Sequence, residues 1–180
     1  QILSSAKEEM FAFVNELFSA KKQKIICTYP ARFYWLKSKL NLPEFNFKNC
    51  KDLNDFIEKA PLEKASIVFA SENLTQPSSM MGHIFIKIEG SNSNQIYVEH
   101  AISFFTEIND FNIPKLIFES LITGKRGYYT LSPYEQNKNY YLLEEQRNIW
   151  EYQLNLNEFD KILLHYYLFE LKNINFSYYF

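Results

Sequence analysis

A short stretch of strict alternation constrains the fold of this chain more than any other feature. In residues 83–89, three isoleucines point to one face and the residues between them to the other, which is the period of a β-strand. The polar residues 90–94 are typical of a turn, and residues 95–103 return as a partner strand. The chain therefore contains an antiparallel hairpin, and we expect a mostly antiparallel sheet around it.

The first third of the chain has the period of helices instead. Ser5 and Glu8 form a capping box, Pro30 can open a second helix, and residues 52–59 predict a third. Beyond residue 65 we expect strands at 66–70, near 128 and at 147–154, and helices at 113–122 and from 157 to about 172. The prediction is an α+β fold with a helical subdomain at 1–62 and an α+β half at 63–180, together one structural domain.

Composition narrows the function classes. Hydrophobic residues make up 47% and charged residues 22% of the 180 residues, as in ordinary folded proteins. The net charge of −2 argues against a protein that binds nucleic acid through its phosphates. No apolar run approaches the roughly 20 residues that span a bilayer. We expect no cofactor and no metal, since the histidines lack carboxylates at ligand spacing.

His83 is the strongest candidate for a catalytic residue. It enters the first strand of the hairpin directly after Gly82, on the face opposite the isoleucines. A histidine held by a strand at the edge of a cleft suits a general base, because its pKa lies near the working pH. A histidine with a purely structural hydrogen bond is the alternative interpretation.

The hairpin register decides which group could orient His83. If Ile88 pairs with Gln95, His83 faces His100; if Glu89 pairs with Gln95, Glu99 lies diagonally from His83. Both alternatives place an orienting group near the imidazole.

The remaining candidates are less specific. Cys27 follows two isoleucines and fits an inert buried thiol, whereas Cys50 lies between polar residues and is expected to be more exposed. A bridge between the two is possible in an exported protein. Ser79 lies shortly before His83 without a nucleophile-elbow motif, so it is interpreted as a loop or substrate-positioning residue.

Four ordered motifs resemble one known family. The segments that carry the resemblance are Cys27-Thr-Tyr-Pro30-Ala31-Arg32, Pro77-Ser78-Ser79-Met80-Met81-Gly82-His83, Glu145-Gln146-Arg147-Asn148-Ile149-Trp150-Glu151 and Leu164-His165-Tyr166-Tyr167-Leu168-Phe169-Glu170-Leu171. Together they resemble the N-terminal periplasmic domain of Lnb-type bacterial lipoprotein N-acyltransferases, over most of the chain.

The resemblance implies a permuted papain-like or NlpC-like fold with a Cys–His thioester mechanism. It assigns the base to His83 and implies a nucleophilic cysteine just beyond Phe180, so the fragment is expected to be truncated before its nucleophile and inactive alone. Arg147 is expected to be structural or to face the substrate. The implied partners are a bacterial lipoprotein and a phospholipid acyl donor, with a periplasmic location and membrane attachment through regions outside this chain.

Two other functions stay open. An amide hydrolase of cell-wall peptides could use the same fold with a small polar cleft. A non-catalytic domain could present the many aromatic residues to lipid or glycan and would not need His83.

Overall fold

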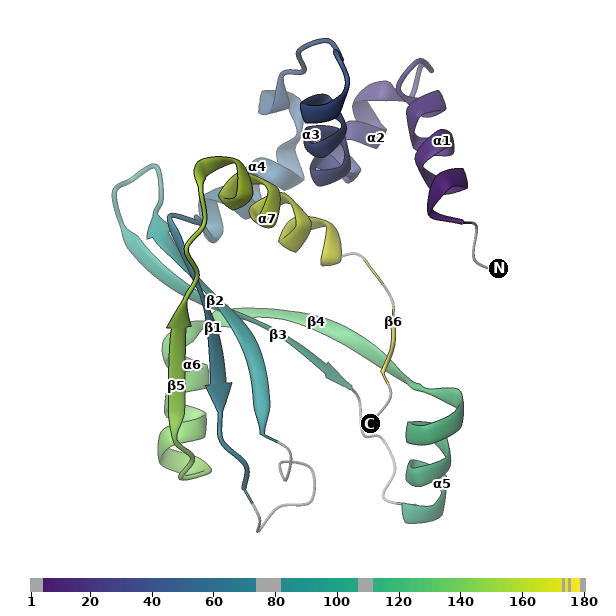
Figure 1. The fold of residues 1–180 in the computed structure, drawn as a ribbon. Coiled ribbons are helices and arrows are strands. Elements are labelled where there is room, and N and C mark those ends of the chain that lie inside the picture. The colour runs from purple at the N-terminus through teal and green to yellow at the C-terminus, as the bar shows by residue number, and fades with distance from the viewer. Residues whose placement is uncertain (1–4, 74–81, 107–111, 173, 175, 179–180) are drawn as a thin grey trace.

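The computed structural model describes residues 5–73, 82–106, 112–172, 174 and 176–178 (Figure 1). The α-helices are α1 (Ala6–Glu16), α2 (Lys22–Thr28), α3 (Pro30–Lys39), α4 (Lys51–Lys59), α5 (Ile113–Phe118), α6 (Tyr134–Asn139) and α7 (Glu158–Leu171). The strands are β1 (Lys64–Ala70), β2 (His83–Ser91), β3 (Tyr97–Thr106), β4 (Lys125–Pro133), β5 (Ile149–Gln153) and β6 (Phe176–Tyr178). A 3₁₀ turn, η1 (Phe47–Asn49), precedes α4, and the π-helical turns η3 (Glu119–Thr123) and η4 (Tyr140–Glu144) follow α5 and α6.

The predicted helices form where the capping signals place them. The Ser5 side chain accepts a hydrogen bond from the amide of Glu8, and the Glu8 carboxylate accepts one from the amide of Ser5, which completes the capping box of α1. Pro30 is the first residue of α3, and Asn157 caps α7. The sequence did not predict α2 or α6. Within the described residues no helix is both long enough and apolar enough to cross a bilayer.

The six strands form one sheet in the order β5-β1-β2-β3-β4-β6, and every pairing is antiparallel. Figure 1 shows helices α1 to α4, here called the helical layer, together with α7 above one end of this sheet, and α6 beside the strands lower down. The mixed fold, with helices first and an antiparallel sheet after them, confirms the predicted α+β class. The division at residues 62 and 63 stays a prediction.

The two faces of the sheet bury different side chains. One face packs Ile88 and Ile102 against Leu53 of α4 and Leu168 of α7. The other face packs a second cluster around Phe85, made of Val68, Ala70, Ala101, Tyr134 and Tyr141. Because neighbouring residues of a strand point to opposite faces, the alternation in 83–89 divides these two cores as the sequence indicates.

Both predicted hairpin registers are wrong. The strands continue through Ser91 and Tyr97, so that Ile88 pairs with His100 and Glu89 with Glu99. Gly90 lies inside β2 and not in the turn. Glycine is needed there because a Cβ would lie 3.0 Å from the backbone nitrogen of Glu63. The turn instead closes on Asn92, whose side chain accepts hydrogen bonds from the amides of residues 94 and 96.

A buried carboxylate joins the helical layer to the rest of the protein. Glu170 of α7 accepts hydrogen bonds through Oε1 from the amides of Ala31 (2.7 Å) and Arg32 (3.2 Å) at the start of α3. The first amides of a helix have no partner within it, and they carry the positive end of its dipole. Burial raises the pKa of Glu170, while these two bonds and the charge of Arg32 oppose the rise.

A disulfide within the helical layer joins Cys27 of α2 to Cys50, the residue before α4. Cys27 is therefore no free thiol, and Cys50 is 2% exposed, so the expectations of an inert thiol and a more exposed one are both corrected. Sequence alone could not place the two sulfurs together, because the turn before α4 brings them into contact across 23 residues.

We expect Glu170→Ala to lower the free energy of unfolding by about 3 kcal/mol, because two amides at the start of α3 lose a buried, charged acceptor. Glu170→Gln keeps an oxygen at the same place and should cost about 1 kcal/mol. Urea unfolding at pH 7 measures both values. Equal losses for the two variants would contradict this expectation, because the oxygen that Glu170→Gln retains would then contribute no stability.

Reduction of the Cys27–Cys50 disulfide should lower the free energy of unfolding by about 3 kcal/mol, the entropy expected for a closed loop of this length. The measurement is urea unfolding with and without dithiothreitol. The double variant Cys27→Ser/Cys50→Ser serves as the control, since its stability should not respond to the reductant. An unchanged wild-type midpoint under reduction would contradict this expectation.

Candidate functional site

His83 opens β2 at the end of the sheet that α4 and α7 leave uncovered. Ile84, the next residue, is 66% exposed on the face that those helices cover farther along. His83 itself points to the opposite face. Gly82 before it has φ +78°, and a Cβ there would lie 2.7 Å from the Phe69 ring. Only glycine fits this entry, so the chain turns into β2 close against β1.

Three aromatic rings surround the imidazole of His83. Its centroid lies 5.0 Å from the ring of Phe105, 6.0 Å from Phe85 and 5.9 Å from Tyr141, all in stacked orientation. Phe105 is the cross-strand neighbour that the observed register brings opposite His83. The rings therefore fix the plane of the imidazole without using its nitrogen atoms.

The Nε2 atom of His83 is buried and has no hydrogen-bond partner among the described residues. Burial lowers the pKa of His83, the charge of Arg147 lowers it further, and the charge of Glu145 partly opposes both. The imidazole is therefore neutral at pH 7. A neutral imidazole with an unpaired nitrogen can take a proton from a group that reaches it.

Glu145 and Arg147 form a buried ion pair behind this aromatic cluster. Nη1 of Arg147 lies 2.7 Å from Oε2 of Glu145, and its Nε donates a hydrogen bond to the carbonyl of Ser71. The hydroxyl of Tyr140 donates to Oε1 of Glu145 at 2.9 Å. The guanidinium of Arg147 also lies 5.3 Å from the centroid of the Tyr141 ring, which stacks on His83. The pair thus holds Tyr141 in place.

His100 and Glu99 do not neighbour His83. In the observed register they lie roughly 16 Å and 20 Å from it along the sheet. His100 pairs with Ile88, so its side chain lies on the opposite face of the sheet from His83. Glu99 shares the face of His83 but binds Lys87 at 2.7 Å. Ser79 lies outside the described residues.

Lys87 gathers three carboxylates on the same face, farther from the sheet end. Its Nζ lies 2.7 Å from Glu89 and Glu99 and 3.1 Å from Glu151, and 4.6 Å from the centroid of the Tyr134 ring. Burial alone would lower the pKa of Lys87, but these bonds raise it, so the lysine stays charged. The described residues contain no group of histidines, cysteines and carboxylates suited to a metal ion.

Three residues of the site, Phe105, Tyr141 and Glu145, were not predicted from the sequence. Phe105 could be found only with the correct register. Glu145 lies in the third motif beside Arg147, and a buried arginine requires a nearby carboxylate, which is the signal that could have identified it.

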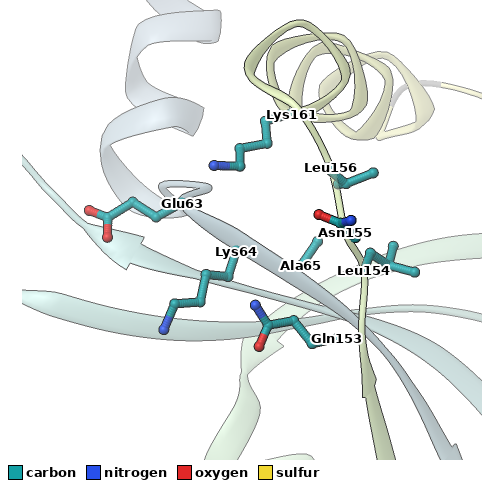
Figure 2. A pocket seen from close by; sticks show the side chains of 8 residues that line it. All are labelled: Glu63, Lys64, Ala65, Gln153, Leu154, Asn155, Leu156 and Lys161. Atoms are coloured by element: carbon teal, nitrogen blue, oxygen red, sulfur yellow. The ribbon is translucent and has the colours of Figure 1, made fainter.

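A pocket of about 540 Å³ lies at the other end of β1, between the first residues of that strand and the start of α7 (Figure 2). Lys64 and Lys161 line it, but each is paired, with Glu89 at 3.5 Å and Glu158 at 2.6 Å. β1 separates the pocket from His83, which pairs with Ala70 at the opposite end of the strand. The pocket is therefore distinct from the histidine site.

Comparison with known families gives two matches. Residues 52–180 match the model of the Lnb N-terminal periplasmic domain, and residues 3–39 match a domain of unknown function (DUF7843). No curated protein and no solved structure matches the chain. The first match covers His83, the Glu145–Arg147 pair and Glu170, and a disulfide is typical of an oxidising compartment such as the periplasm. The chain therefore belongs to the family of Lnb N-terminal periplasmic domains and is periplasmic.

Proposed function

We propose that this chain is the histidine-bearing part of a thiol acyltransferase that acts on bacterial lipoproteins. The observation that carries the proposal is the neutral imidazole of His83, held by aromatic rings with Nε2 buried and unpaired, in a member of this family. Its fold would be a permuted papain-like or NlpC-like arrangement. The nucleophile would be a cysteine after Phe180, because both cysteines of the chain are bonded to each other.

The course of β6 supports a nucleophile at this end of the sheet. Phe176 pairs with Gly127, which pairs with Thr106, next to the residue opposite His83. Phe176 is therefore already level with the start of β2, and β6 runs on to Tyr178 past that end of the sheet. A helix that started after β6 could place its first turn near His83, and a helix N-terminus lowers the pKa of a cysteine thiol.

The reaction would proceed in two balanced steps. His83 takes the thiol proton, and the thiolate attacks the acyl carbonyl of a phospholipid, so that a C–S bond forms while the ester C–O bond breaks. The imidazolium returns its proton to the leaving alkoxide. The α-amine of the lipoprotein's terminal cysteine then attacks the thioester, His83 takes the amine proton, and the C–S bond breaks to give an amide and the thiolate.

A protein that includes the expected cysteine tests the proposal through His83→Ala. Incubation with a phospholipid and mass spectrometry of the intact protein measure thioester formation. We expect the rate to fall about 10²- to 10⁴-fold, the usual loss when a general base is removed. His100→Asn is the control, since its side chain lies on the other face of the sheet and should leave the rate unchanged.

Three outcomes would contradict the proposal: an unchanged rate in His83→Ala, an equal loss in His100→Asn, or a coding sequence that lacks a cysteine after Phe180. The last would favour a non-catalytic domain that binds lipid or glycan.

The proposed base should titrate below its ordinary pKa of 6.5, because burial and Arg147 both disfavour the imidazolium. The neutral form of His83 then stabilises the fold above about pH 6.5, and this contribution is lost as the pH falls through 6.5 toward the lower folded pKa. Titration of the imidazole signals by NMR measures the value. Glu145→Gln, which removes a neighbouring negative charge, should lower it further, and a wild-type pKa at or above 6.5 would contradict the assignment.

A further inference from the structure

The apolar surface of α1 extends beyond the residues that pack into the protein core. Phe13 and Leu17 are buried in the helical layer, while Met10, Phe11 and Phe18 are 40%, 54% and 79% exposed. Phe11 and Phe18 are seven residues apart, so they point in nearly the same direction along α1 and the turn after it. Two phenylalanines on one exposed stripe are unusual on a monomeric surface.

One lysine contacts this stripe, and three more follow it in the chain. The Nζ of Lys7 lies 5.9 Å from the centroid of the Phe11 ring, and Lys21, Lys22 and Lys24 follow Phe18. In the described part of the chain none of these four lysines pairs with a carboxylate.

Glu8, at the edge of the stripe about 60° from Phe11, accepts a hydrogen bond from the amide of Ser5, and the other two carboxylates of α1 point away from the stripe. Glu9 and Glu16 each lie two residues before an exposed phenylalanine, hence about 160° around the helix from it. Glu9 pairs with Arg32 at 3.9 Å, and Glu16 accepts a hydrogen bond from Ser19. The exposed stripe is therefore apolar, with Lys7 beside Phe11 and with three lysines, unpaired among the described residues, in the segment after Phe18, although the whole chain has a net charge of −2.

The neighbouring surface extends the same character. An apolar groove of about 270 Å³ lies between α1 and α3, and Met10 and Trp35 line it. Trp35 is itself exposed, and tryptophan is enriched where proteins meet the headgroup region of a bilayer. Figure 1 shows α1 at the margin of the helical layer, on the side away from β5.

We propose that α1 and the turn after it bind the surface of a bilayer that contains anionic phospholipids. Phe11 and Phe18 enter the boundary between headgroups and acyl chains, and the four lysines contact the phosphates. A second copy of the chain fits this stripe less well, because a symmetric contact would bring the same lysines against each other. This inference does not depend on the proposed catalysis by His83.

Co-sedimentation with vesicles tests the proposal on the 180-residue chain. Wild-type protein should bind vesicles of phosphatidylcholine mixed with phosphatidylglycerol, and bind vesicles of phosphatidylcholine alone much more weakly. Phe11→Ser/Phe18→Ser should reduce binding to the mixed vesicles at least about tenfold, because two inserted rings are lost. The matched control is Leu143→Ser/Tyr152→Ser, which removes two side chains that are 72% and 60% exposed far from α1 and should bind like wild type.

Because all four positions are exposed, each variant should keep the wild-type melting temperature. Absence of wild-type binding to both kinds of vesicle would overturn the proposal, as would equal binding to both or an equal loss in the control variant. Analytical ultracentrifugation supplies the remaining outcome: a wild-type dimer that the two phenylalanine substitutions dissociate would assign the stripe to a second copy instead.

Discussion

The contact between α3 and α7 depends on one carboxylate, that of Glu170, and the position of the first helices on the sheet depends on this contact. Glu170 lies at the end of α7, where Leu168 and Phe169 pack into the main core against the sheet, and it receives the first free amides of α3. Apolar packing has no direction of its own, so it does not by itself decide which residue of α3 meets α7. Two directed hydrogen bonds to a buried charge fix where α3 begins. Pro30, which opens α3 and has no amide proton, leaves the next two amides as the donors.

The four sequence motifs contact one another in pairs in the structure. Pro30, Ala31 and Arg32 of the first motif meet Glu170 of the last one, across about 139 residues. The third motif supplies Glu145 and Arg147, whose ion pair supports Tyr141, and Tyr141 stacks on His83 of the second motif. Segments that are far apart in the chain thus form two contact sites, one that joins the layers and one around the histidine.

Local patterns in the sequence predicted most of the fold, whereas contacts between distant segments could not be predicted. The capping box at Ser5, the proline at the start of α3 and the alternation after His83 each depend only on neighbouring residues, and the structure confirms all three. The hairpin register depends on Gly90, which looks like a turn glycine until Glu63 is seen to pass against it. With Gly90 inside the strand, His100 and Glu99 lie far from His83, and Phe105 lies opposite it. The partner of each cysteine was hidden for the same reason.

The hydrogen bonds of Glu170 to the start of α3 also connect the two proposals. If α1 lies on a bilayer, the helical layer takes a fixed orientation there, because Phe13 and Leu17 pack α1 into this layer and Glu170 binds it to α7. α7 packs on the sheet whose end carries His83, so the sheet cannot turn independently of α1. A substrate held in the bilayer would then meet the histidine in one orientation, without the entropy cost that a flexible connection would add. Removing these hydrogen bonds by Glu170→Ala should therefore impair the reaction of bilayer-bound acyl donors more than it impairs vesicle binding.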